Sequence, residues 1–262
     1  RIRCLCHILN LVVKAILSLF APKKGEKHAG EDENEWDAED DEEVRRAEEE
    51  VDEAVEASDA ATIEELDIEE LINARDLNVE LSDEERELAK NAYRKLNRLG
   101  HRIFNSERLR NQLREIAVAL KLPEAEKKRM IRAVLTRWNT VTDVLLRGLE
   151  LQPALDRLCT TSTGRASIRS LLLTNEEWQL MYQLSLVLVE FKAATLIFSS
   201  NEPRIYEVIP VIDLLNQHLE TPKPAAKRDM FAVVRVAAVA GLGILDKYYA
   251  KTDECLMYRA AM

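Results

Sequence analysis

The stretch Thr136-Arg137-Trp138-Asn139-Thr140, with the run 141–158 behind it, decides most of the fold that the sequence predicts. We expect Asn139 or Thr140 to cap a helix here, because their side-chain oxygens accept hydrogen bonds from the N–H groups of a first turn. Pro153 lacks an N–H group, so we expect it to kink or break this helix. Apolar residues recur at helical spacing in the run and give it one apolar face: Val141, Val144, Leu145, Leu149, Leu151, Leu155 and Leu158.

Arg137 and Trp138 stand just before this helix, where their side chains can reach outward. A guanidinium at this place can hold a phosphate through two parallel hydrogen bonds, and an indole can stack on a nucleic-acid base. The other interpretation is that Trp138 fills the core and that Arg137 is a solvated neighbour. The spacing alone leaves both interpretations open.

The composition favours a mainly helical protein. Of the 262 residues, 47% are hydrophobic, which allows a sizeable core. Seven Gly and seven Pro are few for the many turns of an all-β protein. The chain begins with Arg1 and ends at Met262 without a helix-stop signal, so we interpret it as a fragment of a longer protein.

The charge is segregated along the chain, although the net charge is −10. Residues 31–53 contain 15 acidic and two basic side chains, a local charge of −13. Residues 86–137 contain 15 Lys or Arg against five Glu, a local charge of +10. The acidic run cannot bury a core and is predicted to be a disordered insert. The basic part keeps an anionic partner open despite the acidic total.

These patterns predict helices in nearly every part of the chain. A short helix is expected over 62–74, and the only good strand candidate is 130–135. Capping boxes at 82–85 and 174–177 are expected to open two helices, and Ser106 to open another. Four parts follow: a buried, all-round apolar helix (1–25), an acidic low-complexity linker (26–58), a basic helical segment with one short strand (59–135) and a helical insertion region truncated at its C-terminus (136–262).

The cysteines and the apolar runs indicate in which cellular compartment the protein is found. Cys4, Cys6, Cys159 and Cys255 show no regular spacing, so we expect reduced thiols and an intracellular protein. The apolar run 8–20 is interrupted by a lysine and is shorter than the roughly 20 residues of a membrane span. No membrane partner is expected.

The sequence offers little for catalysis. A Gly-x-Ser-x-Gly elbow, a Walker loop and a dinucleotide fingerprint are all missing from it. Cys4, Cys6 and His7 are three potential zinc ligands, and Cys4 and His7 share a helix face. A second pair of ligands is missing, so no metal site is predicted.

Several motifs together resemble one family. The segment Arg3-Cys4-Leu5-Cys6-His7-Ile8-Leu9-Asn10-Leu11 resembles the Cys-x-x-His and Asn-Leu signature of hAT-superfamily transposases. Thr136-Arg137-Trp138-Asn139, with 145–150 behind it, resembles the Arg-Trp motif of that family. Three further stretches resemble family sequences in the same order, namely 176–178, 191–195 and 207–210. The resemblance extends over nearly the whole chain.

This resemblance implies a helical insertion and a flanking part of an RNase H-like α/β core, which in complete family members cuts and joins DNA. It implies that His7 lies beside a phosphate, that Arg137 and Trp138 hold a DNA end, and that Cys4 and Asn10 belong to the structural motif. In complete members three acidic residues bind two Mg²⁺ or Mn²⁺ ions. Those acids cannot be assigned on this chain, so we expect no cofactor on it and no activity by itself.

The expected function is therefore that of a fragment of a hAT-like transposase, or of a protein derived from one, that binds DNA in the nucleus and can self-associate. The alternative is a non-enzymatic helical interaction module whose acidic run docks on basic partners. A third hypothesis, an autonomous hydrolase, requires two or more carboxylates near His7. Cations of 86–137 that share one face with Trp138 favour DNA, whereas an even spread indicates solvation.

Overall fold

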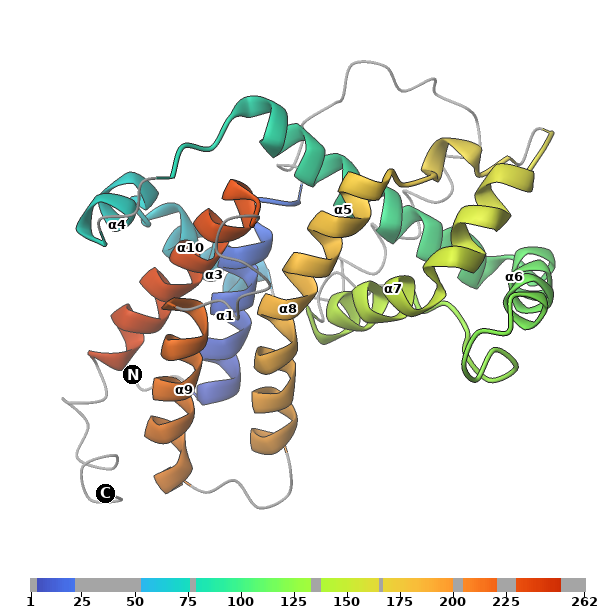
Figure 1. Cartoon of the computed structure of the whole chain (residues 1–262). Helices are drawn as coiled ribbons and strands as arrows, with labels where there is room; N and C mark the ends of the chain where they lie inside the picture. Colours follow the sequence, from blue (N-terminus) through green and yellow to red (C-terminus); the bar gives the residue numbers. More distant parts are fainter. Residues whose placement is uncertain are drawn as a thin grey trace. The chain divides into compact units, whose positions relative to one another are not determined.

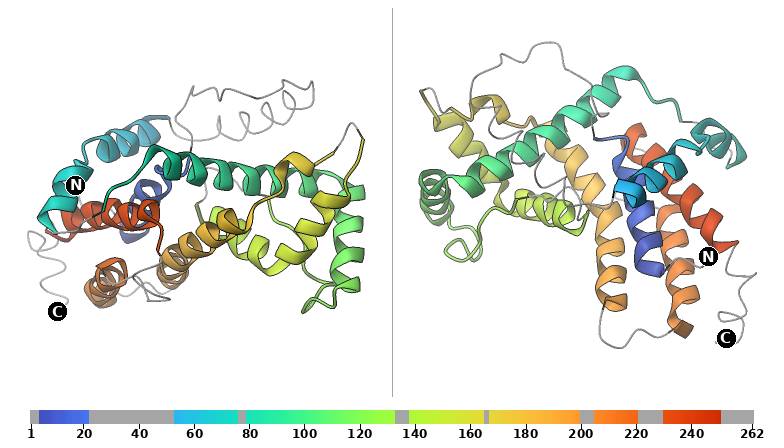
Figure 2. Two further views of the ribbon diagram at one scale, coloured as in Figure 1. Left: turned by 45° about the horizontal axis from the view of Figure 1, so that its top comes forward. Right: turned by 180° about the vertical axis from the view of Figure 1, so that it is seen from behind.

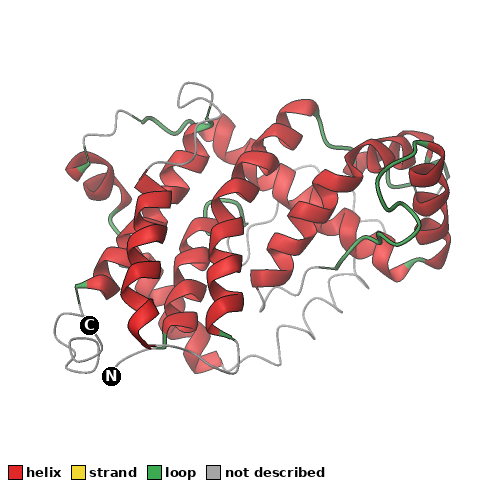
Figure 3. Cartoon of the chain, turned by 60° about the horizontal axis from the view of Figure 1, so that its bottom comes forward, coloured by secondary structure: helices red, strands yellow, loops and turns green. Residues whose placement is uncertain are grey.

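The computed structural model describes residues 4–21, 53–75, 79–132, 138–164, 167–199, 205–220 and 230–250. Every regular element in these ranges is a helix (Figure 3), which confirms the mainly α prediction. The elements are α1 (Leu5–Leu17), α3 (Glu53–Glu64), α4 (Ile68–Ala74), α5 (Asp83–Asn105), α6 (Glu107–Ala119), α7 (Trp138–Thr161), η1 (Arg169–Leu171), α8 (Asn175–Phe198), η2 (Ile205–Glu207), α9 (Val208–Glu220) and α10 (Ala232–Tyr249).

The chain forms two compact units, and each is described by itself. Unit 1 comprises Arg1–Ala21, Glu53–Ala89 and Gln183–Met262, and unit 2 comprises Pro22–Asp52 and Lys90–Tyr182. Each unit therefore combines segments that are far apart in the sequence. The helices α5 and α8 contribute residues to both units.

Helices α1 and α10 pack against each other in unit 1, with α9 and α4 on α10 and α3 on α1. Figures 1 and 2 show α1, α9 and α10 side by side. Nine of the 13 residues of α1 are buried, which confirms the prediction of an all-round apolar helix. The two helices approach closely at Gly241, where an added Cβ would lie 3.0 Å from Ile16 Cδ1.

A buried carboxylate joins α1 to α3. Asp59 is 1% exposed, and its Oδ2 accepts a hydrogen bond from Lys14 Nζ at 3.0 Å. Its other oxygen lies 3.4 Å from His7 Nε2. A buried charge needs such partners, because an uncompensated carboxylate in the core is strongly destabilising.

The helix starts follow the predicted caps. Ser82 Oγ accepts from Glu85 N at 3.2 Å, and Ser106 Oγ accepts from Leu109 N at 3.3 Å. The second half of the box expected at 82–85 is not formed: the Glu85 carboxylate does not return to the Ser82 N–H, and its Oε1 instead accepts from Val233 N at 3.0 Å in the first turn of α10. One carboxylate thereby satisfies a donor that α10 leaves open at its start.

The core of unit 2 forms where α6 and η1 pack on α7. Helix α7 also lies close to α5, because a Cβ on Gly148 would come within 2.8 Å of Leu96 Cδ1. The capping box of α8 is complete: Glu177 N donates to Thr174 Oγ1 at 3.2 Å, and Thr174 N donates to Glu177 Oε2 at 2.7 Å. Lys95 Nζ donates to both carboxylate oxygens of Glu177, at 2.8 and 3.0 Å.

One expectation about α7 is wrong, and a second is only partly right. The helix begins at Trp138, so Asn139 and Thr140 lie inside its first turn and neither is the N-cap. It also continues through Pro153 as one helix of 24 residues, so the expected break is absent, whereas Figure 1 shows α7 bent along its length, as a kink predicts. The ring of Pro153 is exposed, and the buried residues on either side of it, Leu151 and Ala154, hold the backbone helical despite the missing N–H.

Three boundaries also differ from prediction. The expected helix 62–74 is two helices, because Asp67 caps α4 by accepting from Glu70 N at 2.9 Å. The linker 26–58 ends earlier than expected, because α3 begins at Glu53. Residues 130–132 form no strand, and 133–135 lie outside the described residues. The acidic run up to 52 lies outside them too, so its disorder and its docking role stay predictions.

Among the described helices, α8 is long and apolar enough to cross a membrane by length and composition. Half of its most apolar window is buried within the fold. The core helices of soluble proteins meet the same two criteria, so α8 gives only weak support for a membrane span.

Candidate nucleic-acid interface

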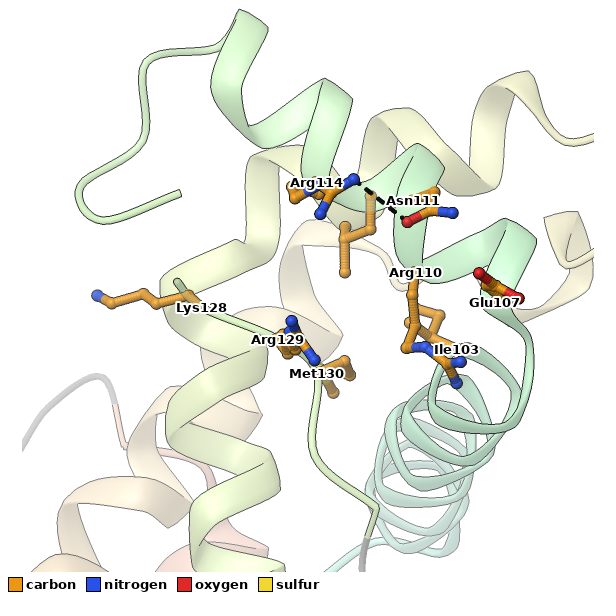
Figure 4. A pocket seen from close by; sticks show the side chains of 9 residues that line it. Ile103, Glu107, Arg110, Asn111, Arg114, Lys128, Arg129 and Met130 are labelled. Carbon is orange, nitrogen blue, oxygen red and sulfur yellow. Dashed lines mark hydrogen bonds between the residues drawn. The ribbon is translucent and has the colours of Figure 1, made fainter. Parts of the chain in front are cut away.

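A basic hollow of about 210 Å³ lies in unit 2 between α6 and the segment that follows it (Figure 4). Four of its lining side chains are cations and one is a carboxylate, so the lining carries a net charge of 4 − 1 = +3. The lining residues are Ile103, Glu107, Arg110, Asn111, Leu113, Arg114, Lys128, Arg129 and Met130.

Helix α6 supplies two of the four cations. Ser106 fixes the start of this helix as its N-cap, so the register of the residues behind it is set. Arg110 and Arg114 are four residues apart and therefore share one helix face. Arg110 donates through Nη1 to the backbone oxygen of Phe104, and Arg114 Nη2 donates to Asn111 Oδ1 at 3.3 Å. These bonds hold the two guanidinium groups at the rim of the hollow.

The chain reverses direction after α6 without using a glycine. Lys121 N donates to Val118 O at 2.9 Å, and Leu122 N donates to Ala117 O at 3.0 Å, which is the Schellman pattern of a helix end. Lys121 has φ 54°, and Glu124 in the next turn has φ 54° as well. Both residues adopt the left-handed conformation, which a β-carbon disfavours. This double reversal brings Lys128 and Arg129 back towards α6.

We predict that Lys121→Gly stabilises unit 2. Glycine adopts the left-handed conformation without steric cost, so the free energy of unfolding should rise by about 0.5–1 kcal/mol. Urea denaturation of the variant and of the wild type measures the difference. Lys127→Gly is the matched control, because Lys127 shows no positive φ, and it should not be stabilised. Equal stability of Lys121→Gly and wild type would contradict the assigned strain.

The segment 128–132 is held against two helices. A Cβ on Gly100 of α5 would lie 2.8 Å from Ile131 O, so only glycine fits where the segment passes. Arg147 of α7 donates through Nη1 to Arg129 O at 2.7 Å. Lys128 Nζ lies 3.2 Å from Glu150 Oε2, also on α7. The backbone under the last two cations is thus fixed, which preorganises the hollow.

The guanidinium of Arg129 is the cation best placed for an incoming anion. It is exposed and makes no hydrogen bond or ion pair with another described residue, whereas the backbone oxygen of Arg129 accepts from Arg147. Lys128, by comparison, is already shared between Glu150 at 3.2 Å and Glu124 at 3.8 Å. An Arg guanidinium binds phosphate oxygens through two parallel hydrogen bonds. The hollow can therefore hold one phosphate group of a polymer without breaking an existing ion pair.

The residues that the sequence singled out do not line this hollow. Trp138 is 6% exposed and is the first residue of α7, so its burial favours the core interpretation, and its role at a DNA end stays a prediction. Arg137 lies outside the described residues. His7 belongs to unit 1, is 24% exposed and lies beside Asp59. His7 and Trp138 belong to different units.

The other two motif residues are also in unit 1. Cys4 precedes α1 and is exposed, with its backbone oxygen accepting from His7 N at 3.0 Å, and Asn10 is half-buried within the helix. Among the described residues, no group of three His, Cys, Asp or Glu side chains is arranged to hold a metal ion.

A half-buried carboxylate of unit 2, that of Asp156, bonds to the buried indole of Trp178. Trp178 Nε1 donates to Asp156 Oδ1 at 2.9 Å. Burial raises the pKa of the Asp156 carboxyl above its ordinary value of 3.8, and the indole hydrogen bond lowers it by less. Burial, followed by the nearby Asp156 charge, raises the pKa of Cys159 to about 12. Cys159 is therefore a thiol at neutral pH and has no nucleophilic role.

We predict a pH dependence of stability from Asp156. A raised folded-state pKa means that the native protein holds this proton more tightly, so its contribution is present below pH 3.8 and is lost as the pH rises through the raised pKa. Asp156→Asn keeps an acceptor for the indole and removes a half-buried charge, so its free energy of unfolding at pH 7 should equal or exceed that of wild type. Asp156→Leu leaves the Trp178 N–H unpaired and should cost about 1–3 kcal/mol. An Asn variant as unstable as the Leu variant, in urea denaturation at pH 7, would contradict this account.

The cations of the hollow were visible only as part of a basic segment. The sequence shows Arg110 and Arg114 on an outer helix face and a run of three cations at 127–129. The reversal that brings these two sets together depends on the left-handed conformations of Lys121 and Glu124. Neither residue type indicates such a conformation in the sequence.

Fold and site together define a mainly α-helical protein with a basic, preorganised hollow. Comparison with known proteins gives one match of note: the chain is 31% identical over 124 residues to tpeD from Talaromyces stipitatus, which is described as a proposed transcriptional regulator. The match covers 47% of this chain and 12% of tpeD, so the chain spans a small part of that relative. No family model matches the chain, and no solved structure matches it.

Proposed function

We propose that this chain is part of a DNA-binding protein of the hAT transposase type, or derived from one, and that unit 2 binds the DNA backbone at its basic hollow. On this proposal the described helices correspond to the helical insertion and to helices that flank an RNase H-like core. The whole protein acts on DNA in the nucleus, and Mg²⁺ or Mn²⁺ is required only where a complete set of catalytic acids is present.

The observation that carries the proposal is the convergence of Arg110, Arg114, Lys128 and Arg129 on one hollow. Clustered cations of this kind neutralise phosphates and release counterions, which supplies most of the affinity of non-specific DNA binding. The lining also has an apolar part, formed by the buried side chains of Ile103, Leu113 and Met130. The similarity to a proposed transcriptional regulator also supports a function exercised on DNA.

The proposal assigns no chemical step to this chain. Its cations hold and orient a phosphodiester backbone, which is a positioning task. The two residues that the Arg-Trp resemblance implicates, Arg137 and Trp138, remain candidates for a contact at a DNA end. Binding of the DNA backbone by the four cations of the hollow does not require that contact. Backbone binding and DNA-end recognition are therefore tested by different variants.

The test is a titration of the full chain into fluorescent duplex DNA, followed by anisotropy. Arg114→Ala/Arg129→Ala should bind about tenfold more weakly than wild type at about 100 mM salt, because two phosphate contacts are lost. Arg157→Ala is the matched control, since Arg157 is an exposed arginine of unit 2 that does not line the hollow, and it should bind like wild type.

Equal DNA affinities of the double variant and of Arg157→Ala would contradict the assignment of the hollow as a DNA-binding site. Circular dichroism of both variants checks that helicity is unchanged. A hairpin-ended duplex is titrated alongside the plain one, because preference for the hairpin reports on end recognition and is separate from backbone binding.

A further inference from the structure

Unit 1 contains a second recess, with the opposite charge. A groove of about 660 Å³ lies where α3 ends, along α4 and against the start of α5. It is lined by Leu19, Glu64, Glu65, Leu66, Asp67, Ile68, Glu69, Ile72, Glu80, Leu81, Arg86 and Val236. Five carboxylates and one guanidinium give the lining a net charge of 1 − 5 = −4.

The floor of this groove is apolar. Ile68, Ile72 and Leu81 are only partly covered, and Val236 of α10 closes the floor beneath them at 3% exposure. Partly covered aliphatic side chains in a recess are stabilised when another apolar group excludes water from them.

The rim of the groove is acidic, and some of its carboxylates form no ion pair with a described residue. Glu65 is paired with Lys247 at 2.9 Å, and Asp67 is used as the cap of α4. Glu64, Glu69 and Glu80 are exposed and have no ion pair with any described residue. These three carboxylates surround apolar surface and repel nucleic acid.

We propose that this groove binds a cationic amphipathic segment of a partner protein, with leucine-like side chains on the floor and Lys or Arg at the acidic rim. The charge of the lining determines which partner fits. A neutral segment gains no electrostatic attraction from Glu64, Glu69 and Glu80, and these carboxylates repel an acidic segment or a phosphate backbone. An amphipathic helix that binds in an apolar groove does so through apolar side chains at positions i, i+4 and i+7. The site is separate from the basic hollow, so it adds a protein partner to a DNA-directed chain.

The probe is a synthetic helical peptide with leucines at i, i+4 and i+7 and lysines on its flanks, one leucine being a photoreactive analogue. It is titrated with the full chain at about 150 mM salt, where exposed charges beyond about 8 Å are screened. Glu69→Lys/Glu80→Lys should weaken binding about tenfold. Asp213→Lys, an exposed carboxylate of α9 in the same unit, is the matched control and should leave binding unchanged.

Two peptide controls separate the groove from plain charge attraction, which matters because residues 31–53 carry a charge of −13. A peptide of the same composition with its leucines scattered should bind at least about tenfold more weakly, since it cannot place its anchors on the floor. Photocrosslinks of the patterned peptide should map to residues between 64 and 81. Equal binding of the patterned and scattered peptides, wild-type affinity of the Glu69→Lys/Glu80→Lys variant, or crosslinks confined to other segments would each overturn the proposal.

Discussion

Trp138→Ala is expected to lower the free energy of unfolding by about 3–5 kcal/mol, because it removes a large buried side chain. Trp138 is 6% exposed at the first turn of α7, beside the buried Val141 and Thr142. A loss of this size is a large part of the roughly 5–15 kcal/mol that stabilises a typical domain. Urea denaturation followed by circular dichroism measures it.

The matched control is Trp138→Phe, which keeps an aromatic ring in the core and should lose much less. The comparison also decides how DNA binding by Trp138 variants is interpreted. If Trp138→Ala is as stable as wild type and yet loses preference for hairpin-ended DNA, the indole contacts DNA and the core interpretation is wrong. If it loses stability and Trp138→Phe binds normally, the indole is structural.

Glu177→Ala is expected to cost about 2–4 kcal/mol, since it removes one partner from a largely buried ion pair. The carboxylate is 3% exposed and accepts from Lys95 Nζ at 2.8 Å and from Thr174 N at 2.7 Å. Without it, the Lys95 ammonium retains the Leu172 oxygen at 3.3 Å, and the Thr174 N–H loses its acceptor. Thermal or urea denaturation gives the loss.

Glu176→Ala is the matched control for this variant. Glu176 is the preceding residue in the same first turn but is exposed, so its removal should change stability by no more than about 0.5 kcal/mol. In the double variant Lys95→Met/Glu177→Leu both charges are gone, so part of the lost stability should return. Equal effects of Glu176→Ala and Glu177→Ala would contradict the assigned capping and pairing.

Local features of the fold could be predicted from the sequence. The burial of α1 follows from apolar residues on all its faces, and the starts of α5, α6 and α8 follow from Ser82, Ser106 and Thr174. These features depend on residues within a few positions of one another, so the sequence pattern contains the necessary information.

Features that depend on distant residues could not be predicted. Glu85 accepts from Val233, 148 positions away, and Lys95 pairs with Glu177, 82 positions away. The break at Asp67 and the uninterrupted helix through Pro153 depend on how each helix packs in its unit, which overrides local preference. A sequence pattern does not state which distant segment supplies a partner.

The candidate site shows the same division. The excess of cations in residues 86–137 was evident from the sequence, but the cations that converge were not. Convergence depends on the left-handed Lys121 and Glu124, two residue types that do not indicate a reversal. Trp138 stood out because it stands beside Arg137 before a helix and matches an Arg-Trp motif, and its 6% exposure favours the core interpretation.

The measurement that tests the central claim most directly is the salt dependence of DNA affinity. The slope of log K against log [salt] should be shallower by about 2 for Arg114→Ala/Arg129→Ala than for wild type, since each phosphate contact contributes about 0.9 to the slope. Arg157→Ala should keep the wild-type slope. A double variant whose slope equals that of wild type would show that the hollow contacts no phosphate, and would contradict the account.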